Sequence, residues 1–418
     1  MSRPPIACLT AFALLIAGGC GSSTVVTPPN QTSPVVPTPT PTATPMPAYH
    51  LVYNFQGTPD GSAPIGGLIA ANGVLYGTTS SGGANDGGTV FSVSASGTSS
   101  LLHTFGGAGD GSHAFATLVD EGGTLFGTTS HGGANGDGTT FAIGDTGATY
   151  ELSYSFGATP TDGIVPFAGM TVLGGVLYGT TAGGGTHNGA GTVFGIAMNG
   201  SKYEVLHEFG KGSDGAEPFT SMTVLNGALY GTTLYGGAYP CTVYVECGVV
   251  FRIDPSGAER VLHSFGSTGD GNGPQGALLA VGSTLYGTTF FGGASGKCPN
   301  GHGVTARCGT VFRIDANGKN YAVLHSFGKT ADGAEPDGSL IEMNGTLYGT
   351  TLSGGASGYG TIFSINPDGT NYRVVHSFGG LPDGQYPEGA LTTSNGAIYG
   401  ATAGGGTTKN GTVYSLTF

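Results

Sequence analysis

From residue 50 onward, apolar runs of about five residues alternate with turns rich in Gly, Asn, Asp and Pro. Such runs are too short for helices and are typical of β-strands. One unit holds four of them, over residues 338–343, 346–351, 360–365 and 372–378. Asn344-Gly345 joins the first two runs, and both residues tolerate the positive φ of a type I′ hairpin turn. The pattern predicts a unit of four antiparallel strands.

The same unit occurs seven times along the chain. The run Leu-Tyr-Gly-Thr-Thr, or a close variant, recurs at intervals of about 50 residues, centred on Tyr76, Phe126, Tyr178, Tyr230, Tyr286, Tyr348 and Tyr399. Seven four-stranded units predict an all-β fold, a seven-bladed β-propeller of antiparallel blades. Because the last unit ends after its third strand, we expect residues 50–56 to pair with residues 411–417 and close the ring.

Three repeated motifs carry a resemblance to a known family. Leu-Tyr-Gly-Thr-Thr, Gly-Gly-Ala and Gly-Thr-Val-Phe resemble the GloVer tandem repeat, a β-propeller-like repeat of bacterial exported proteins whose anchoring devices vary. The resemblance covers residues 50–418. It implies a surface-exposed protein with an interchangeable anchor, and it supplies no catalytic or ligand-binding residues.

The N-terminal region predicts export and anchoring. Residues 1–19 contain one early cation, a short apolar run and small residues before Cys20, as in a lipoprotein signal peptide, although Ala17 stands where the lipobox usually has Leu. We expect Cys20 to be lipidated, residues 20–48 to form a disordered Pro/Thr-rich tether and residues 49–418 to form the propeller. The protein is therefore expected at the bacterial cell envelope, on the outer membrane or cell surface. Plain secretion with an unmodified Cys20 is the alternative.

Composition narrows the possible partners. The chain has 83 Gly and 23 Pro in 418 residues, which argues against a helical protein, and the repeat places most of the Gly in turns. The Gly of each Tyr-Gly-Thr-Thr run is expected where blades approach closely. Only 12 Lys and Arg oppose 25 Asp and Glu, so we expect no nucleic-acid partner. We expect a monomer with no metal and no cofactor.

Two polar sets recur with the repeat. A His or Tyr occupies one fourth-strand position, at Tyr53, His103, Tyr154, His207, His263, His325 and His376. An Asp before Gly follows in every unit, at Asp60, Asp110, Asp162, Asp214, Asp270, Asp332 and Asp383. The rings are expected to pack at blade edges, and each carboxylate is expected to accept backbone N–H bonds in its own turn. The alternative for the Asp set is an acidic ring that binds calcium or cationic groups.

A binding site for one ligand must break the sevenfold pattern, and one position does so. After the Pro of the loop, or its equivalent, the units carry Ile65, Phe115, Phe167, Phe219, Gln275, Asp337 and Glu388. These loops converge on the axis, where propellers usually bind ligands. We therefore predict an apolar arc that faces a polar one, with Glu217 and Glu335 beside it.

Two longer loops in units four and five are the other departure. They contain Cys241, Cys247, Cys298 and Cys308, an even number in an exported protein. Disulfides Cys241–Cys247 and Cys298–Cys308 are expected from position, although pairing between the loops stays open. An aromatic contact patch is predicted on the same face, from Tyr235, Tyr239, Tyr244, Phe290, Phe291 and His302.

These features favour a binding or display module for a glycan or protein ligand. One alternative is a polysaccharide-degrading hydrolase or lyase, with Asp337, Glu388 and Glu335 as acid and base. The other is a passive structural module of the envelope. Because the sequence contains no Gly-x-Ser-x-Gly, no metal-binding His pair and no phosphate loop, no catalytic residue is assigned.

Overall fold

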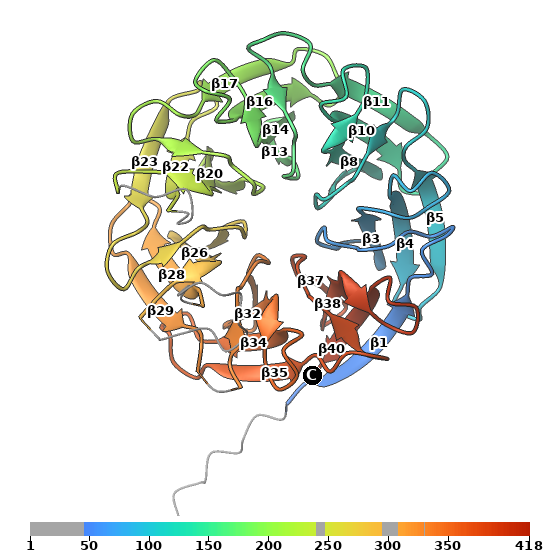
Figure 1. Ribbon diagram of the computed structural model, residues 1–418, viewed down its shortest axis with the longest axis vertical. Coiled ribbons are helices and arrows are strands. Elements are labelled where there is room, and N and C mark those ends of the chain that lie inside the picture. Colours follow the sequence, from blue (N-terminus) through green and yellow to red (C-terminus); the bar gives the residue numbers. More distant parts are fainter. Residues whose placement is uncertain (1–45, 240–246, 295–307, 330) are drawn as a thin grey trace, which may run out of the picture. The chain divides into compact units, whose positions relative to one another are not determined.

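The computed structural model describes residues 46–239, 247–294, 308–329 and 331–418. These residues form β-strands, turns and bends, and they contain no helix that could cross a membrane. The strands build seven four-stranded antiparallel sheets that follow one another around a ring (Figure 1). The predicted seven-bladed β-propeller is confirmed.

Each blade runs from a three-residue inner strand to a longer outer strand, in sequence order except in blade 7, whose outer strand is the N-terminal one. Blade 1 comprises β2 (Ile69–Ala71), β3 (Val74–Thr79), β4 (Thr89–Ser94) and β5 (Ser99–Thr104); blade 2 comprises β7 (Val119–Glu121), β8 (Thr124–Thr129), β10 (Thr139–Gly144) and β11 (Tyr150–Ser155). Blade 3 comprises β13 (Thr171–Leu173), β14 (Val176–Thr181), β16 (Thr192–Ala197) and β17 (Glu204–Glu208); blade 4 comprises β19 (Thr223–Leu225), β20 (Ala228–Thr233), β22 (Val249–Ile253) and β23 (Glu259–Ser264).

The remaining blades repeat this order. Blade 5 comprises β25 (Leu279–Val281), β26 (Thr284–Thr289), β28 (Thr310–Asp315) and β29 (Ala322–Ser326); blade 6 comprises β31 (Ile341–Met343), β32 (Thr346–Thr351), β34 (Thr361–Ile365) and β35 (Arg373–Ser377). Blade 7 comprises β37 (Thr392–Ser394), β38 (Ala397–Thr402), β40 (Thr412–Thr417) and β1 (Ala48–Asn54). The expected first strand of unit six is shorter than predicted, because residues 338–340 belong to the loop at the axis.

Short two-residue pairs tie the loop that enters a blade to the loop after its second strand. They are β6 (Gly111–Ser112) with β9 (His131–Gly132), β12 (Gly163–Ile164) with β15 (Gly183–Gly184), β18 (Gly215–Ala216) with β21 (Tyr235–Gly236), β24 (Gly271–Asn272) with β27 (Phe291–Gly292), β30 (Gly333–Ala334) with β33 (Ser353–Gly354), and β36 (Gly384–Gln385) with β39 (Gly404–Gly405). These pairs hold both loops in one layer on the same face of the ring.

The two ends of the ring meet in blade 7. β1 pairs antiparallel with β40, from Ala48 opposite Thr417 to Asn54 opposite Thr412. In Figure 1 the N-terminal strand lies along the outside of the C-terminal blade. The predicted closure is confirmed, and it removes two free sheet edges that would otherwise be open to pairing with another chain.

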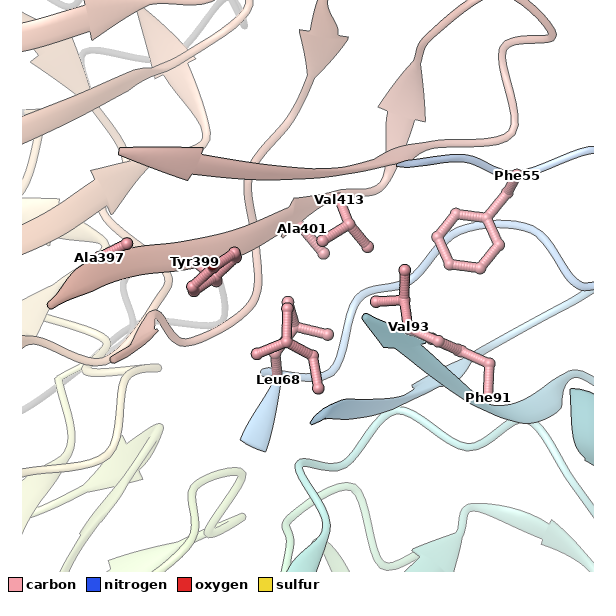
Figure 2. Close-up of a cluster of buried hydrophobic side chains, with 9 residues drawn as sticks. Phe55, Leu68, Phe91, Val93, Ala397, Tyr399, Ala401 and Val413 are labelled. Carbon is pink, nitrogen blue, oxygen red and sulfur yellow. The ribbon is translucent and has the colours of Figure 1, made fainter. Parts of the chain in front are cut away.

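Buried apolar side chains fill the space between neighbouring blades. Figure 2 shows one such cluster, in which Phe91 and Val93 of blade 1 face Tyr399 and Val413 of blade 7. The expectation that Gly77 marks a close approach of two blades was wrong. A Cβ there would lie 2.7 Å from Cζ of Phe91, within the same sheet. The Gly therefore makes room for the Phe ring of its own blade.

Candidate functional site

A polar network joins neighbouring blades near the outer rim. At the junction of blades 1 and 2, Nε2 of His103 lies 2.8 Å from Oδ2 of Asp110, and the Gly111 N–H donates to Oδ1 at 2.7 Å. The hydroxyl of Tyr150, from the next blade, donates to Oδ1 at 2.5 Å, and its ring stacks on His103 at 3.7 Å between centroids. The two repeated polar sets of the sequence are thus partners in one network.

Four other junctions stack two rings in the same way. The pairs are Tyr154 with Tyr203, His263 with Tyr321, His325 with Tyr372, and His376 with Tyr49. Burial raises the pKa of Asp332, but hydrogen bonds from His325 and Tyr372 outweigh it, so the pKa lies below its ordinary value. All seven Asp side chains accept at least one hydrogen bond from the protein. They are scaffold residues that shape the loops.

The junction of blades 3 and 4 departs from this pattern. Glu259 stands where five junctions have Tyr, and its Oε1 is buried without a hydrogen-bond partner. Burial and the charge of Asp214 raise the pKa of Glu259 to about 7. Nε2 of His207 lies 3.3 Å from Oδ2 of Asp214, but it makes no hydrogen bond. This junction is the least satisfied part of the polar network.

Loops from all seven blades converge on the axis and line one cavity of about 190 Å³. The first Thr of each Leu-Tyr-Gly-Thr-Thr motif helps to place them: Thr78 and Thr128 donate to the carbonyls of Ala116 and Ala168 in the next loops, at 3.1 and 2.9 Å. The lining includes all seven positions at which the units differ, namely Ile65, Phe115, Phe167, Phe219, Gln275, Asp337 and Glu388. We call this space the axial cavity.

One wall of the axial cavity is aromatic. Phe115 and Phe167 lie 5.2 Å apart between ring centroids, and Phe167 and Phe219 lie 4.9 Å apart and stack at 21°. Because each ring comes from a different blade, the three form a continuous surface across blades 2, 3 and 4. All three side chains are half-buried and keep one side accessible to the cavity.

The other wall carries Gln275, Asp337 and Glu388, from blades 5, 6 and 7. Burial raises the pKa of Asp337 to about 7, and the charges of Glu388 and Glu335 add to this rise. Burial also raises the pKa of Glu388 to about 7. Unlike the Asp residues of the outer network, neither carboxylate has a hydrogen bond or ion pair within the described part of the chain.

Glu217 and Glu335 lie near the axial cavity but are not among its lining residues. Both have a positive φ, 54° and 59°, at the residue before the loop Pro. Ser353 donates to Oε2 of Glu335 at 2.7 Å, and burial raises the pKa of Glu217. Of the two, Glu335 acts electrostatically on the cavity, through its charge near Asp337.

The predicted aromatic patch is only partly described. Tyr244, His302, Cys241 and Cys298 lie outside the described residues, so the patch and both disulfide pairings stay predictions. The ring of Phe291 packs edge-to-face on Phe290 at 4.7 Å, and Tyr239 is 44% exposed. Pairing of β24 with β27 keeps Phe291 in the loop layer that leads to the axial cavity.

Among residues 46–239, 247–294, 308–329 and 331–418, no three His, Cys, Asp or Glu side chains are grouped so as to hold a metal ion. The sequence pattern identified the cavity lining because those positions break the repeat. It missed the pairing of the repeated His and Asp residues, although their separation of seven residues, from His103 to Asp110 and from His325 to Asp332, was a readable signal. It also missed the Tyr partners, which come from the next blade.

The repeat matches the profile of a known family. The sequence profile of the Gloeobacter/Verrucomicrobia repeat matches residues 40–245 and 242–418. No curated protein matches the chain. Among solved structures, a chain in the crystal structure of a nidogen/laminin complex is 15% identical, with a TM-score of 0.38 over 63% of this chain and 82% of that one. At that score, the likeness carries no argument about function.

Proposed function

Because the chain belongs to the Gloeobacter/Verrucomicrobia repeat family and its repeats close into a propeller, we propose that it is a binding module displayed at the bacterial cell envelope. In this proposal a glycan or protein ligand docks on the loop-bearing face and places one group in the axial cavity. A lipid on Cys20 and the tether that precedes β1 hold the ring at the membrane. Disulfides in the two longer loops stiffen the same face.

One observation carries the proposal: the differences among the seven units meet in one cavity. A ring of identical units offers the same surface seven times, so a site for a single ligand requires unlike residues at the axis. Here three Phe rings face two carboxylates and an amide across one cavity. Carboxylates with raised pKa values and no partner are unfavourable for folding alone, and such groups are concentrated at functional sites.

The same carboxylates support a second candidate function. A carboxyl with a pKa of about 7 suits general acid catalysis near neutral pH, and both Asp337 and Glu388 meet this condition. A hydrolase or lyase that acts on polysaccharide is therefore the alternative. Glu335, the third residue expected in that chemistry, does not line the cavity.

The test is binding of the purified full chain to glycan and peptide arrays, with site-specific variants. We expect Phe167→Ala to weaken binding at least tenfold, because it removes the central ring of the aromatic wall. Glu151→Gln, at an exposed site on β11, is the matched surface control and is expected to bind normally. Loss of binding in Tyr239→Ala but not in Phe167→Ala would move the site to the longer loops.

The alternatives give different results in the same assays. Product release from an array polysaccharide that stops in Asp337→Asn would favour the enzyme. Binding to no array component, together with co-purifying envelope proteins that tolerate Phe167→Ala, would contradict the proposal and favour a passive structural module.

A further inference from the structure

The size of the axial cavity limits what it can hold. Sites for drug-sized ligands usually span about 300–1,000 Å³. The axial cavity has about 190 Å³. It therefore suits one side chain or one small group that projects from a larger molecule, and it is too small for a whole oligosaccharide. The rest of such a ligand would lie on the surrounding loops.

The charge of the cavity is of one sign. Asp337 and Glu388 are the only ionisable side chains among its described lining residues, and none of those residues is Lys or Arg. Each Asp of the outer network receives hydrogen bonds from a ring, a backbone N–H or both, whereas these two carboxylates receive none from the described chain. A positive group brought by a ligand would supply the donor that these two carboxylates lack within the described chain.

The aromatic wall indicates which chemical group would accompany the positive charge. The three Phe rings offer apolar surface to a short stem, and the faces of aromatic rings attract cations within about 6 Å. An ammonium on an apolar stem satisfies both walls at once, because the stem packs on Phe167 while the N–H bonds reach the carboxylates and the amide of Gln275. A hard divalent cation suits this cavity less well, because it prefers six or more oxygen ligands and gains nothing from an aromatic wall.

Resting on the proposed function, we propose that the axial cavity binds a single ammonium group carried on a short apolar stem. The stem lies against the rings of Phe115, Phe167 and Phe219, and the ammonium lies between Asp337 and Glu388. A lysine side chain of a protein ligand and a free alkyl amine share this chemistry.

The experiment compares benzylammonium with benzyl alcohol in calorimetric titrations of the full chain at pH 8. We expect the ammonium to bind at least tenfold more tightly than the alcohol. The double variant Asp337→Asn/Glu388→Gln is expected to abolish this preference while keeping weak binding of the alcohol. Because the variant removes two unpaired carboxylates, it is expected to fold, and thermal unfolding checks this.

The pH dependence of the affinity provides a second readout. Asp337 and Glu388 face the ammonium, and Glu335 adds its charge from the same loop as Asp337. Below pH 7 the first two become protonated and lose their charge. We therefore expect the affinity for benzylammonium to fall about tenfold between pH 8 and pH 5.5, while the affinity for benzyl alcohol stays constant.

A further set of probes distinguishes the two possible sources of the ammonium group, a protein side chain and a free amine. Nα-acetyl-lysine methylamide represents a protein side chain, putrescine represents a free amine, and the Nε-acetylated lysine derivative is the neutral control. Stronger binding of either amine than of the control supports the inference and identifies the source. Equal binding of charged and neutral probes, an unchanged preference in the double variant, or calcium binding in place of the amines would overturn it.

The failure of this inference is distinguishable from failure of the proposed function. If the array ligand binds in a Phe167-dependent way but no amine does, the proposed function stands and the ammonium assignment is wrong. If neither the arrays nor the amines give Phe167-dependent binding, both are wrong.

Discussion

Asp332 and Asp337 lie five residues apart in one loop, yet they differ in their hydrogen bonds and in the direction of their pKa shifts. Asp332 is buried and accepts hydrogen bonds from the Gly333 N–H at 2.9 Å and from the Tyr372 hydroxyl, with His325 Nε2 at 3.1 Å. Its pKa is lowered. Asp337 lines the axial cavity without a donor, and its pKa is raised to about 7.

The difference shows that partners, rather than burial, decide what a carboxylate does in this ring. Where donors converge, the ionised form is stabilised and the group holds two blades together. Where donors are absent, an ionised carboxylate lowers the stability of the fold. Such a carboxylate stays available to a ligand. The outer rim therefore supplies the scaffold, and the axis supplies the candidate site.

The largest expected effect comes from removing the satisfied carboxylate. Asp332→Ala leaves the His325 ring, the Tyr372 hydroxyl and the Gly333 N–H without their acceptor, so we expect a loss of about 3 kcal/mol in the free energy of unfolding. Asp337→Ala is the matched control from the same loop, and it is expected to be neutral or stabilising at pH 8. Urea-induced unfolding measures both. Equal losses in the two variants would remove the contrast.

The next effect tests whether a missing partner can be restored. Glu259→Tyr places a ring beside His207 and a hydroxyl near Asp214, as at five other junctions, and we expect a gain of about 1–2 kcal/mol at pH 8. The raised pKa of Glu259 means that its folded state binds an extra proton between its unfolded value and about pH 7. The native residue therefore destabilises the fold progressively over that range, and the gain should be smaller at pH 5.

Glu151→Tyr adds the same ring at an exposed site of β11 and should leave unfolding unchanged. If Glu259→Tyr lowers stability at both pH values, the junction of blades 3 and 4 has a different use for its carboxylate.

A smaller effect is expected from neutralising the axial carboxylate. Because the pKa of Asp337 is raised to about 7, its ionisation in the folded state opposes folding as pH rises above its unfolded value, and the penalty is complete above pH 7. We expect Asp337→Asn to raise the unfolding temperature by about 2–4 °C at pH 8 and to leave it unchanged at pH 4. Differential scanning calorimetry at the two pH values checks this. A lowered unfolding temperature at pH 8 would mean that Asp337 is a scaffold residue.

The smallest effect concerns a hydroxyl in the blade core. Tyr414 occupies the position that is Phe in the other six blades, and its buried hydroxyl has no partner. Tyr414→Phe should stabilise the ring by about 1 kcal/mol. The reverse change in blade 6, Phe363→Tyr, buries an unpartnered hydroxyl over Gly349, as Tyr414 does over Gly400, and it should destabilise by about 1 kcal/mol. Chemical unfolding of both variants tests whether Tyr414 serves anything beyond packing.

The candidate site was largely predictable because it lies in the loops where the repeat changes. Alignment of the seven units alone identified the seven positions at which they differ, from Ile65 in unit one to Glu388 in unit seven. The structure brings all seven of these residues to one cavity. The pKa values were not predictable, because desolvation of Asp337 and Glu388 depends on what surrounds them. The hydrogen bonds between neighbouring blades were also missed, because partners such as Tyr150 and Asp110 are 40 residues apart in the sequence.

The sequence by itself determined the number of blades, the strand boundaries to within a few residues and the strand that closes the ring. It did so because short apolar runs, Asn-Gly turns and the incomplete last unit are local signals. Only the tertiary structure decided which polar groups have partners. The polar groups of each outer junction come from two neighbouring blades, and the axial lining comes from all seven, so hydrogen bonding and desolvation arise only when the ring is closed.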